Sequence, residues 1–193
     1  MRLGIDTSAG QCAVALVDAE GVRARQIERM TRGHAERLFP LIEAALAEAG
    51  AHYHDITGIG VCTGPGSFTG IRAGVAAARG LGLGLGVAVH GLDRFEALRL
   101  GTTQDQPLTV ALAGPQQTVF LATPEHAPHQ TSLDALPAAQ GLRLGDGWPG
   151  AGEEAGLPDP AILATAAKAA PKPFYLRPPN ADPPREAPPR MLD

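Results

Sequence analysis

Two short segments of the sequence carry residue types that bind phosphate in nucleotide-dependent enzymes. Asp6, Thr7 and Ser8 end an apolar run near the N-terminus. An aspartate at such a position can hold a magnesium ion through water, and nearby hydroxyl and backbone N–H groups can face a phosphate. The alternative is that these side chains only form a turn by hydrogen bonding to the local backbone, and three residues taken alone favour that alternative.

The second segment is glycine-rich and lies between a predicted strand and a predicted helix. It runs Gly-Pro-Gly-Ser-Phe-Thr-Gly over residues 64–70. The free N–H groups and the dipole at a helix start can bind an anion, but the segment lacks the Gly-Lys-Ser/Thr ending of a phosphate-binding P-loop. The alternative is a tight turn in which Ser67 or Thr69 caps the helix and Phe68 packs beneath it. The candidate phosphate-type residues of both segments are Asp6, Thr7, Ser8, Gly64, Gly66, Ser67 and Thr69.

No other group of residues has the spacing of a catalytic or metal-binding set. His52 and His54 form a His-x-His pair in a polar turn, where a solvated loop is favoured over a metal site. Cys12 and Cys62 lie in apolar stretches without flanking histidines, so we predict buried thiols and not zinc ligands. The sequence therefore predicts no catalytic residue and no metal site.

The charge pattern argues against a chain that grips nucleic acid by itself. The formal net charge of the 193 residues is −4, and Lys and Arg are scattered without a run of three. A chain that held nucleic acid alone would show a basic face or stripe. The N-terminus lacks a signal-peptide pattern, and the longest near-apolar run, residues 75–89, is interrupted by Arg79 and four glycines. We expect a cytoplasmic protein without a membrane span.

The hydrophobic pattern of the first hundred residues predicts one α/β lobe. Residues 3–7, 12–17 and 22–27 form short runs typical of an antiparallel meander. A helical stripe covers residues 34–49, with Pro40 either in the first turn of a shorter helix or kinking a longer one. Residues 56–62 resemble a buried strand, open to parallel pairing, and a second helix follows over residues 70–84.

Weaker signals continue beyond that helix. We predict strands over residues 87–90, 108–113 and 118–122, a helix opened by a capping box at Asp93 and Glu96 and ending at Leu100, and a short helix from Asp159 to Lys168. Eight of the residues from 171 to 189 are proline, which indicates an extended, mobile tail. The order β-β-β-α-β-α is typical of a ribonuclease-H-like lobe, the repeated half of actin, sugar kinases and heat-shock ATPases.

These elements predict an α/β, actin-like fold with a mixed sheet and a trimmed second lobe. The predicted boundaries are residues 1–102 for the first lobe, 103–170 for the second lobe and 171–193 for the proline-rich tail.

The second predicted helix is unusually rich in small residues. Glycine and alanine recur at spacings of three and four from Gly70 to Gly84. Each glycine costs about 0.5–1 kcal/mol of helical stability relative to alanine, so we expect close packing in return. Either the helix packs on its own sheet, or it meets a helix of a partner.

Several motifs resemble the TsaB family in order and spacing. They are Ile-Asp-Thr-Ser at residues 5–8, His-Ala-Glu-Arg-Leu-Phe-Pro-Leu-Ile at residues 34–42 and the glycine-rich segment with Ile71 and Arg72. Gly91 with residues 95–98, and Pro-Phe-Tyr-Leu-Arg at residues 173–177, resemble later family segments. The strong resemblance covers about residues 1–100.

The resemblance implies a non-catalytic, two-lobed scaffold in the synthesis of threonylcarbamoyladenosine on tRNA. It implies pairing of the two helices with the catalytic relative TsaD, recruitment of the ATPase TsaE, and homodimers through the same surface when alone. tRNA would bind only within the complex. It implies no cofactor in the isolated chain, with ATP or ADP at the level of the complex. The interface residues implied are His34, Leu38, Leu41, Ile42, Ala45, Gly70, Arg72, Ala73, Gly74 and Ala77.

Two departures bear on activity. TsaD carries a metal-binding His-x-x-x-His pair, whose positions align with Arg94 and Leu98 here, and neither side chain can replace a neutral imidazole as a metal ligand. The strand that opens the second lobe in the TsaB family aligns with residues 113–120, which lack its acid and its arginine. The second lobe is therefore expected to be degenerate and too short to close an ATP cleft.

Two other hypotheses remain. One is a small actin-like ATPase or phosphotransferase, or a peptidase, motivated by Asp6–Thr7–Ser8 and the glycine-rich segment. The other is a generic dimeric binding module whose helix face serves only self-association.

Overall fold

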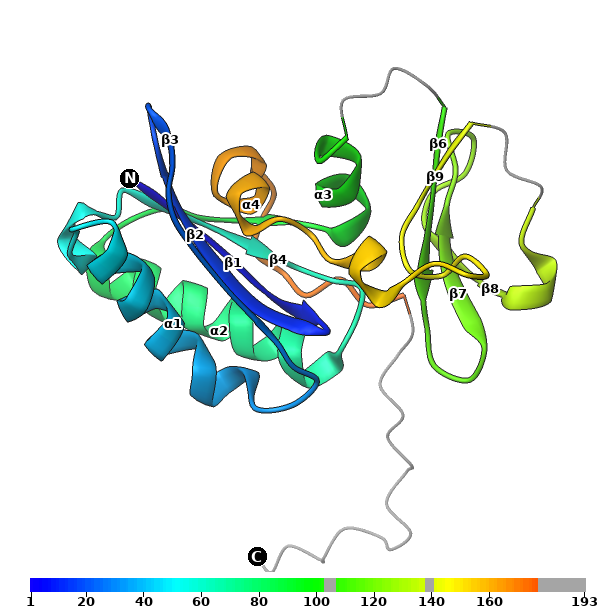
Figure 1. Ribbon diagram of the computed structural model, residues 1–193, viewed down its shortest axis with the longest axis horizontal. Helices are drawn as coiled ribbons and strands as arrows, with labels where there is room; N and C mark the ends of the chain where they lie inside the picture. Colours follow the sequence, from blue (N-terminus) through cyan, green and yellow to red (C-terminus); the bar gives the residue numbers. More distant parts are fainter. Residues whose placement is uncertain (103–106, 138–140, 177–193) are drawn as a thin grey trace, which may run out of the picture.

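The computed structural model describes residues 1–102, 107–137 and 141–176. It contains two sheets that lie next to each other, with three of the four α-helices packed around the first sheet and α3 between the sheets (Figure 1). The elements of the first lobe are β1 (Arg2–Ala9), β2 (Gln11–Asp18), β3 (Gly21–Arg29), α1 (His34–Glu48), β4 (Gly58–Cys62), α2 (Phe68–Leu85), β5 (Val89–Leu92) and α3 (Arg94–Leu100).

The first sheet has the strand order β3-β2-β1-β4-β5. The first three strands form an antiparallel meander, and β4 and β5 add in parallel beside β1. This is the ribonuclease-H-like order that the sequence predicts, and the buried strand over 56–62 is indeed parallel to β1. Pro40 lies within α1, which continues to Glu48, so the longer of the two predicted helices is present.

Helix starts agree with the capping residues more closely than with the apolar pattern. α2 begins at Phe68, two residues before the predicted start, because the Ser67 hydroxyl accepts a hydrogen bond from Gly70 N (3.2 Å). Ser67, and not Thr69, is therefore the cap. α3 begins as predicted, with the Asp93 carboxylate accepting from Glu96 N (2.9 Å).

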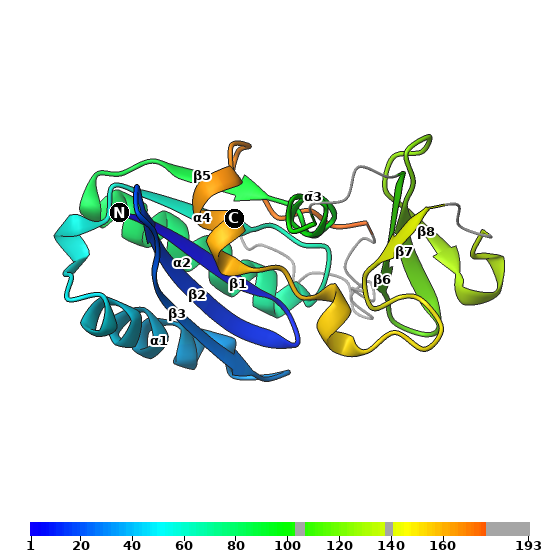
Figure 2. The same cartoon turned by 45° about the horizontal axis from the view of Figure 1, so that its top comes forward.

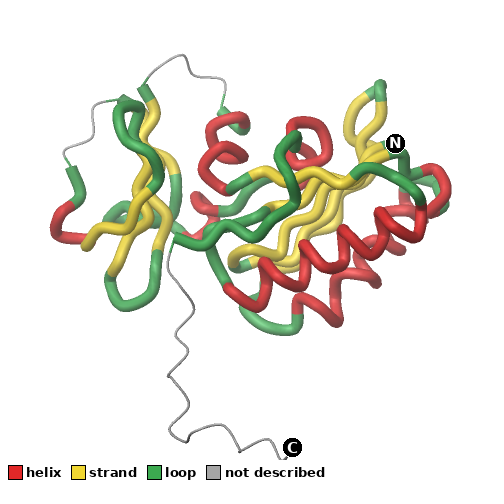
Figure 3. The backbone as a smooth tube through the Cα atoms, turned by 180° about the vertical axis from the view of Figure 1, so that it is seen from behind, coloured by secondary structure: helices red, strands yellow, loops and turns green. Residues whose placement is uncertain are grey.

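Helices cover both faces of the first sheet. α1 and α2 lie side by side on one face, and α4 (Pro160–Ala166) lies on the other (Figures 1 and 3). Two glycines allow α4 to approach so closely: a Cβ on Gly4 would lie 1.8 Å from Pro160 O, and one on Gly60 would lie 1.7 Å from Leu163 O. The neighbouring residues of the same strands, such as Leu3 and Ile5, point to α1 and α2 and form the main core.

The second sheet repeats part of the first. Its strands are β6 (Leu108–Ala113), β7 (Thr118–Ala122), β8 (His129–Ser132) and β9 (Leu142–Leu144), in the order β8-β7-β6-β9. β6, β7 and β8 form an antiparallel meander, and β9 pairs in parallel with β6. These four strands correspond in order to β1, β2, β3 and β4 of the first sheet. A short 3₁₀ turn (Leu133–Ala135) is described between β8 and β9, where the first lobe has the long helix α1. The fold is therefore actin-like, with two related lobes of which the second is reduced.

α3 lies between the two sheets (Figure 2). Its Phe95 packs with Val110, Leu112 and Phe120 of the second lobe, while Ala97 packs with Leu163 of α4. The helix therefore belongs to the core of both lobes.

The predicted lobe boundaries differ from the packing in two places. α4 falls within residues 103–170, predicted as the second lobe, but it packs on β1, β2 and β4 of the first sheet. Residues 171–176, predicted as part of a tail, are packed as well: Phe174 N donates to Thr63 O (2.8 Å), and the preceding Ala169 bridges to Gly91. The rest of the predicted tail, residues 177–193, lies outside the described residues.

Among the described helices, none combines the length and the hydropathy needed to cross a bilayer.

Candidate functional site

A cleft of about 780 Å³ opens between the two lobes. The β1–β2 turn, the glycine-rich loop before α2, the β6–β7 turn and the segment after α4 surround it. Its lining includes Ser8, Ala9, Gly10, Gly66, Ser67, Phe68, Arg94, Gly114, Gln116, Phe120, Asp146, Glu153, Leu157, Phe174, Tyr175 and Leu176.

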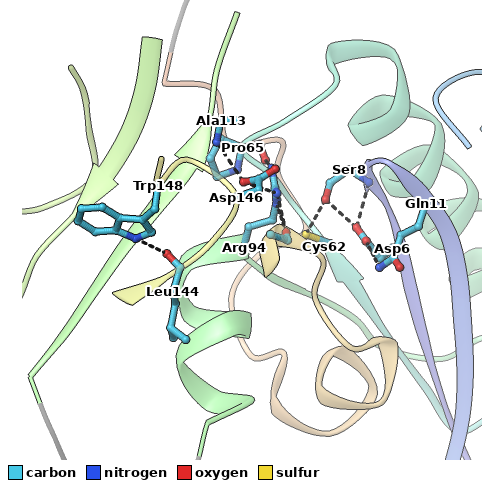
Figure 4. Close-up of polar contacts among 11 residues, drawn as sticks. Asp6, Ser8, Gln11, Cys62, Pro65, Arg94, Ala113, Leu144, Asp146 and Trp148 are labelled. Atoms are coloured by element: carbon cyan, nitrogen blue, oxygen red, sulfur yellow. Dashed lines mark hydrogen bonds and ion pairs between the residues drawn. The ribbon is translucent and has the colours of Figure 1, made fainter. Parts of the chain in front are cut away.

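Asp6 does not point into this cleft. Its side chain is fully buried within β1, opposite Ala13 of β2. Oδ1 accepts hydrogen bonds from the backbone N (2.9 Å) and the hydroxyl (2.6 Å) of Ser8, and Oδ2 accepts from Gln11 Nε2 (2.8 Å), as Figure 4 shows. Both carboxylate oxygens are thus engaged within the chain. This geometry supports the predicted turn over a magnesium-binding aspartate.

The two predicted phosphate-type segments pack against each other. Ser67 N donates to Ser8 O (2.8 Å), and the Thr7 hydroxyl donates to Gly70 O (2.8 Å). A Cβ on Gly66 would lie 1.9 Å from Ser8 O, so only glycine permits this contact. The contact leaves Ser8, Gly66 and Ser67 at the cleft, Asp6, Thr7 and Gly64 buried beneath it, and Thr69 exposed outside it.

Three of the N–H groups near the two segments are used within the chain. Ser8 N is bound by Asp6, Ser67 N by Ser8 O, and Gly70 N by the Ser67 hydroxyl. A helix start binds a phosphate through N–H groups that have no other acceptor. These three donors do not meet that condition.

Arg94 joins the lobes at the base of the cleft. Its side chain is buried, with Nη1 donating to Pro65 O (3.1 Å) and Nε to Gly156 O (3.1 Å). Nη2 lies 3.6 Å from Asp146 Oδ1, which in turn accepts from Ala113 N (3.0 Å; Figure 4). The guanidinium therefore bridges the glycine-rich loop, the segment before α4 and the second sheet. In the sequence, Arg94 stands out only because it aligns with a metal-binding histidine of TsaD, and no local pattern signals Asp146 or Gly156.

Within the described residues, no three His, Cys, Asp or Glu side chains gather into a possible metal site. Leu98 packs with Phe95 in the core between the lobes. His52 and His54 stack on each other, with ring centroids 5.4 Å apart. The two thiols are buried, as predicted, and burial raises the pKa of the Cys12 thiol to about 12.

Most of the interface residues implied by the resemblance are not on the surface. Residues His34, Leu38, Leu41, Ile42 and Ala45 of α1 are buried on the sheet side, and Gly70 and Gly74 of α2 are buried as well. A Cβ on Gly74 would lie 2.3 Å from the Thr7 hydroxyl, so that glycine serves the packing of α2 on its own sheet. Arg72 is exposed, and Ala73 and Ala77 are half-buried. These residues are buried because an apolar stripe at helical spacing marks the face of a helix that packs on the protein's own core.

The outer face of the helix pair carries a different set of residues. Phe39 of α1 is 41% exposed, and Leu83 of α2 is 87% exposed. Ala76, Gly80 and Gly84 of α2 are exposed, and a Cβ on either glycine would meet no atom within 4 Å. The packing of the chain itself does not explain these two glycines.

The segment after α4 is fastened to α2 beside this face. The guanidinium carbon of Arg72 lies 3.9 Å from the centroid of the Phe68 ring, and Arg72 Nε donates to the Tyr175 hydroxyl (3.1 Å). The centroids of the Phe68 and Tyr175 rings are 5.0 Å apart. This cation–π cluster of Phe68, Arg72 and Tyr175 therefore joins α2 to the segment after α4 at the wall of the cleft.

Comparison with known proteins gives consistent relatives. The family model of TsaD, tRNA N6-adenosine threonylcarbamoyltransferase, matches residues 22–140. The tRNA N6-adenosine threonylcarbamoyltransferase of Cereibacter sphaeroides is 32% identical over 212 residues, covering 94% of this chain and 56% of the relative. The tRNA threonylcarbamoyladenosine biosynthesis protein TsaB of Escherichia coli is 34% identical, covering 58% of this chain and 48% of the relative. The chain thus spans about half the length of these relatives.

Other relatives match over more of their own length. The uncharacterized protein Rv3421c of Mycobacterium tuberculosis is 36% identical, covering 81% of this chain and 82% of the relative. A crystal structure of a Pseudomonas aeruginosa protein, reported as similar to peptidase YEAZ, superimposes with a TM-score of 0.62 at 25% identity, covering 74% of this chain and 73% of that one. The two-lobed fold, the sequence motifs and these relatives all indicate the same family. The chain belongs to the TsaD family, tRNA N6-adenosine threonylcarbamoyltransferase, as a TsaB (YeaZ-type) member.

Proposed function

We propose that this chain is a non-catalytic scaffold subunit in the synthesis of threonylcarbamoyladenosine on tRNA, and that it binds and activates a TsaD-type catalytic subunit. The complex would recruit the ATPase TsaE, and tRNA and ATP or ADP would bind at the level of the complex, in the cytoplasm. Without its partner the chain would form a homodimer through the same surface.

The chemistry of the cleft supports a non-catalytic role. Its buried arginine, Arg94, is held by two carbonyl groups and lies beside a carboxylate. The carboxylate of Asp6 is held by Ser8 and Gln11. Catalysis of phosphoryl or acyl transfer needs donors or a base that are free to meet the substrate. Arg94 and Leu98, aligned with the metal-binding histidines of TsaD, are poor metal ligands.

The single observation that carries the partner proposal is the outer face of α2. Gly80 and Gly84 lie in open space, and Leu83 between them is 87% exposed. Two glycines in one exposed helical stretch lower its stability, and a large exposed apolar side chain gains nothing from water. A helix of a partner that packs closely on this face would compensate for both.

The test is complex formation with the TsaD-type subunit of the same organism, measured by size-exclusion chromatography with light scattering. Ala76→Arg places a long cation on the exposed face of α2. Thr165→Arg is the matched control, because Thr165 is exposed on α4, which covers the opposite face of the sheet.

We expect a 1:1 complex for the wild type and for Thr165→Arg, and loss of the complex for Ala76→Arg with an unchanged unfolding curve. Equal binding by both variants would place the interface elsewhere. Absence of a complex with a folded wild type, or turnover of magnesium-ATP by the isolated chain, would contradict the scaffold proposal itself.

A further inference from the structure

The cleft between the lobes is a second candidate binding site, separate from the helix face. At about 780 Å³ it has the size of a site for a drug-sized ligand or a short peptide. Its wall is largely apolar, with Phe68, Phe120, Phe174 and Tyr175 among the lining residues. The scaffold function proposed above uses Ala76, Gly80 and Leu83 of α2, which do not line this cleft, and it leaves the cleft without a role.

The charges of the described lining do not fit an anionic ligand. Arg94 is the cation at the cleft, and its donors are directed to Pro65 O, Gly156 O and the Asp146 carboxylate. The remaining ionisable groups among the described lining residues that are charged at neutral pH are Asp146 and Glu153, both acidic. A phosphate would therefore meet two carboxylates and no unoccupied cation.

The same lining does fit a cation with apolar neighbours. The guanidinium of Arg72 already lies over Phe68 at 3.9 Å and donates to the Tyr175 hydroxyl, so the aromatic rings left for a ligand are Phe120 and Phe174. Aromatic rings next to carboxylates attract guanidinium and ammonium groups. Among the described residues, Glu153 has no ion-pair partner, so its carboxylate is available to such a group.

We propose that the cleft receives a basic side chain, arginine or lysine, carried on an extended segment of a partner polypeptide. The cation would pair with Glu153, because the Asp146 carboxylate already lies beside Arg94 and accepts from Ala113 N, and apolar neighbours in the segment would pack on Phe120 and Phe174. A cleft of this size takes more than one side chain, which favours a peptide over a free amine. The proposal does not depend on the helix face.

In the test, a short peptide, acetyl-Phe-Arg-Leu-amide, is titrated into the full chain, and NMR records the shifts of the backbone amide signals of the chain. Peptides with citrulline or glutamate in place of arginine are the controls, because citrulline keeps the shape of arginine without its charge. We expect shifts at Gly66, Gly114 and Gln116 of the cleft. The amides of Ala76 and Gly80 on the outer helix face should not move.

A matched pair of variants tests the charge. Glu153→Gln removes a carboxylate of the cleft, whereas Glu154→Gln changes an exposed neighbour that pairs with Arg29 and does not line the cleft. We expect Glu153→Gln to lower the affinity for the arginine peptide by about two- to fivefold and Glu154→Gln to leave that affinity unchanged.

Three results would overturn the proposal. The first is equal affinity for the arginine and citrulline peptides, or no binding of either. The second is a set of shifts confined to α1 and α2, which would place the peptide on the helix face. The third is displacement of the peptide by AMP or ATP through the same amides, which would make the cleft an anion site.

Discussion

At the scale of single residues, Arg94 holds the two lobes together through groups on three separate segments. Its guanidinium contacts Pro65 O and Gly156 O and lies near Asp146, from inside a buried site. Its planar fork reaches acceptors in several directions, which the point charge of lysine cannot do. Removal of the side chain would leave the two buried carbonyls without this donor and the Asp146 carboxylate without its neighbouring cation.

We predict that Arg94→Met lowers the free energy of unfolding by about 2–3 kcal/mol, because buried acceptors lose their partner. Arg94→Lys should restore only part of this loss. Glu96→Gln on the same helix is the control, since Glu96 is exposed and should change stability by less than about 0.5 kcal/mol. Urea denaturation measures all three, and a wild-type midpoint for Arg94→Met would exclude a joining role.

The two cysteines give a prediction about pH. Both thiols are buried, and burial raises the pKa of the Cys12 thiol to about 12 and also raises the pKa of the Cys62 thiol. Because the thiolate is the reactive form, raising the pH from 7 to 9 should not bring either thiol into reaction in the folded protein. Labelling by a disulfide reagent with and without denaturant checks this, and rapid labelling of the native chain at pH 9 would contradict it.

The residue scale also shows where sequence reasoning ends. The hydrogen bonds of Asp6 to nearby Ser8 could be predicted as the turn-forming alternative, whereas the continuation of β1 past Asp6 to Ala9 could not. The third donor to Asp6, Gln11, lies on the next strand and carries no pattern of its own. The partners of Arg94 are 29 to 62 residues away along the chain, so only the folded structure brings them together.

At the scale of elements, the helices and most strands could be predicted, but the role of each helix face could not. An apolar stripe at helical spacing says which face is buried, not what buries it. In α1 and α2 the stripe meets the protein's own sheet, so the residues left exposed are those that the pattern leaves out. The glycines divide in the same way, with Gly74 required by Thr7 and Gly80 in open space.

The difference between exposed and buried glycines predicts opposite effects on stability for Gly80→Ala and Gly60→Ala. Gly80→Ala adds a methyl group where nothing lies within 4 Å, so it should stabilise the isolated chain by about 0.5–1 kcal/mol through helix propensity. If a partner helix packs closely there, the same change should weaken the complex. Thermal unfolding and titration calorimetry with the TsaD-type subunit measure the two effects.

Gly60→Ala is the control for the interior. Its Cβ would lie 1.7 Å from Leu163 O of α4, so it should destabilise the chain by more than about 3 kcal/mol. A Gly80→Ala chain that is more stable and binds as tightly as the wild type would show that no helix approaches α2 at this point.

At the scale of the whole molecule, the chain makes one lobe, most of a second, and then returns to the first. The second sheet repeats four strands of the first in order and direction, which local pattern alone did not reveal because its strands are short and its connections lack a long helix. The return of α4 to β1 joins residues about 160 positions apart and depends on the small size of Gly4 and Gly60. Such long-range packing has no local signal, so the sequence pattern alone does not join α4 to the first sheet.

The most direct test of the scaffold proposal is hydroxyl-radical footprinting of the chain with and without its TsaD-type partner. Phe39 and Leu83 lie exposed on α1 and α2, and Ile27 of β3 and Leu133 near the second sheet are exposed controls. We predict that the partner protects Phe39 and Leu83 from oxidation and leaves Ile27 and Leu133 unchanged. Unchanged oxidation of Leu83 in a complex that forms, with protection at Leu133, would contradict docking through the outer helix face.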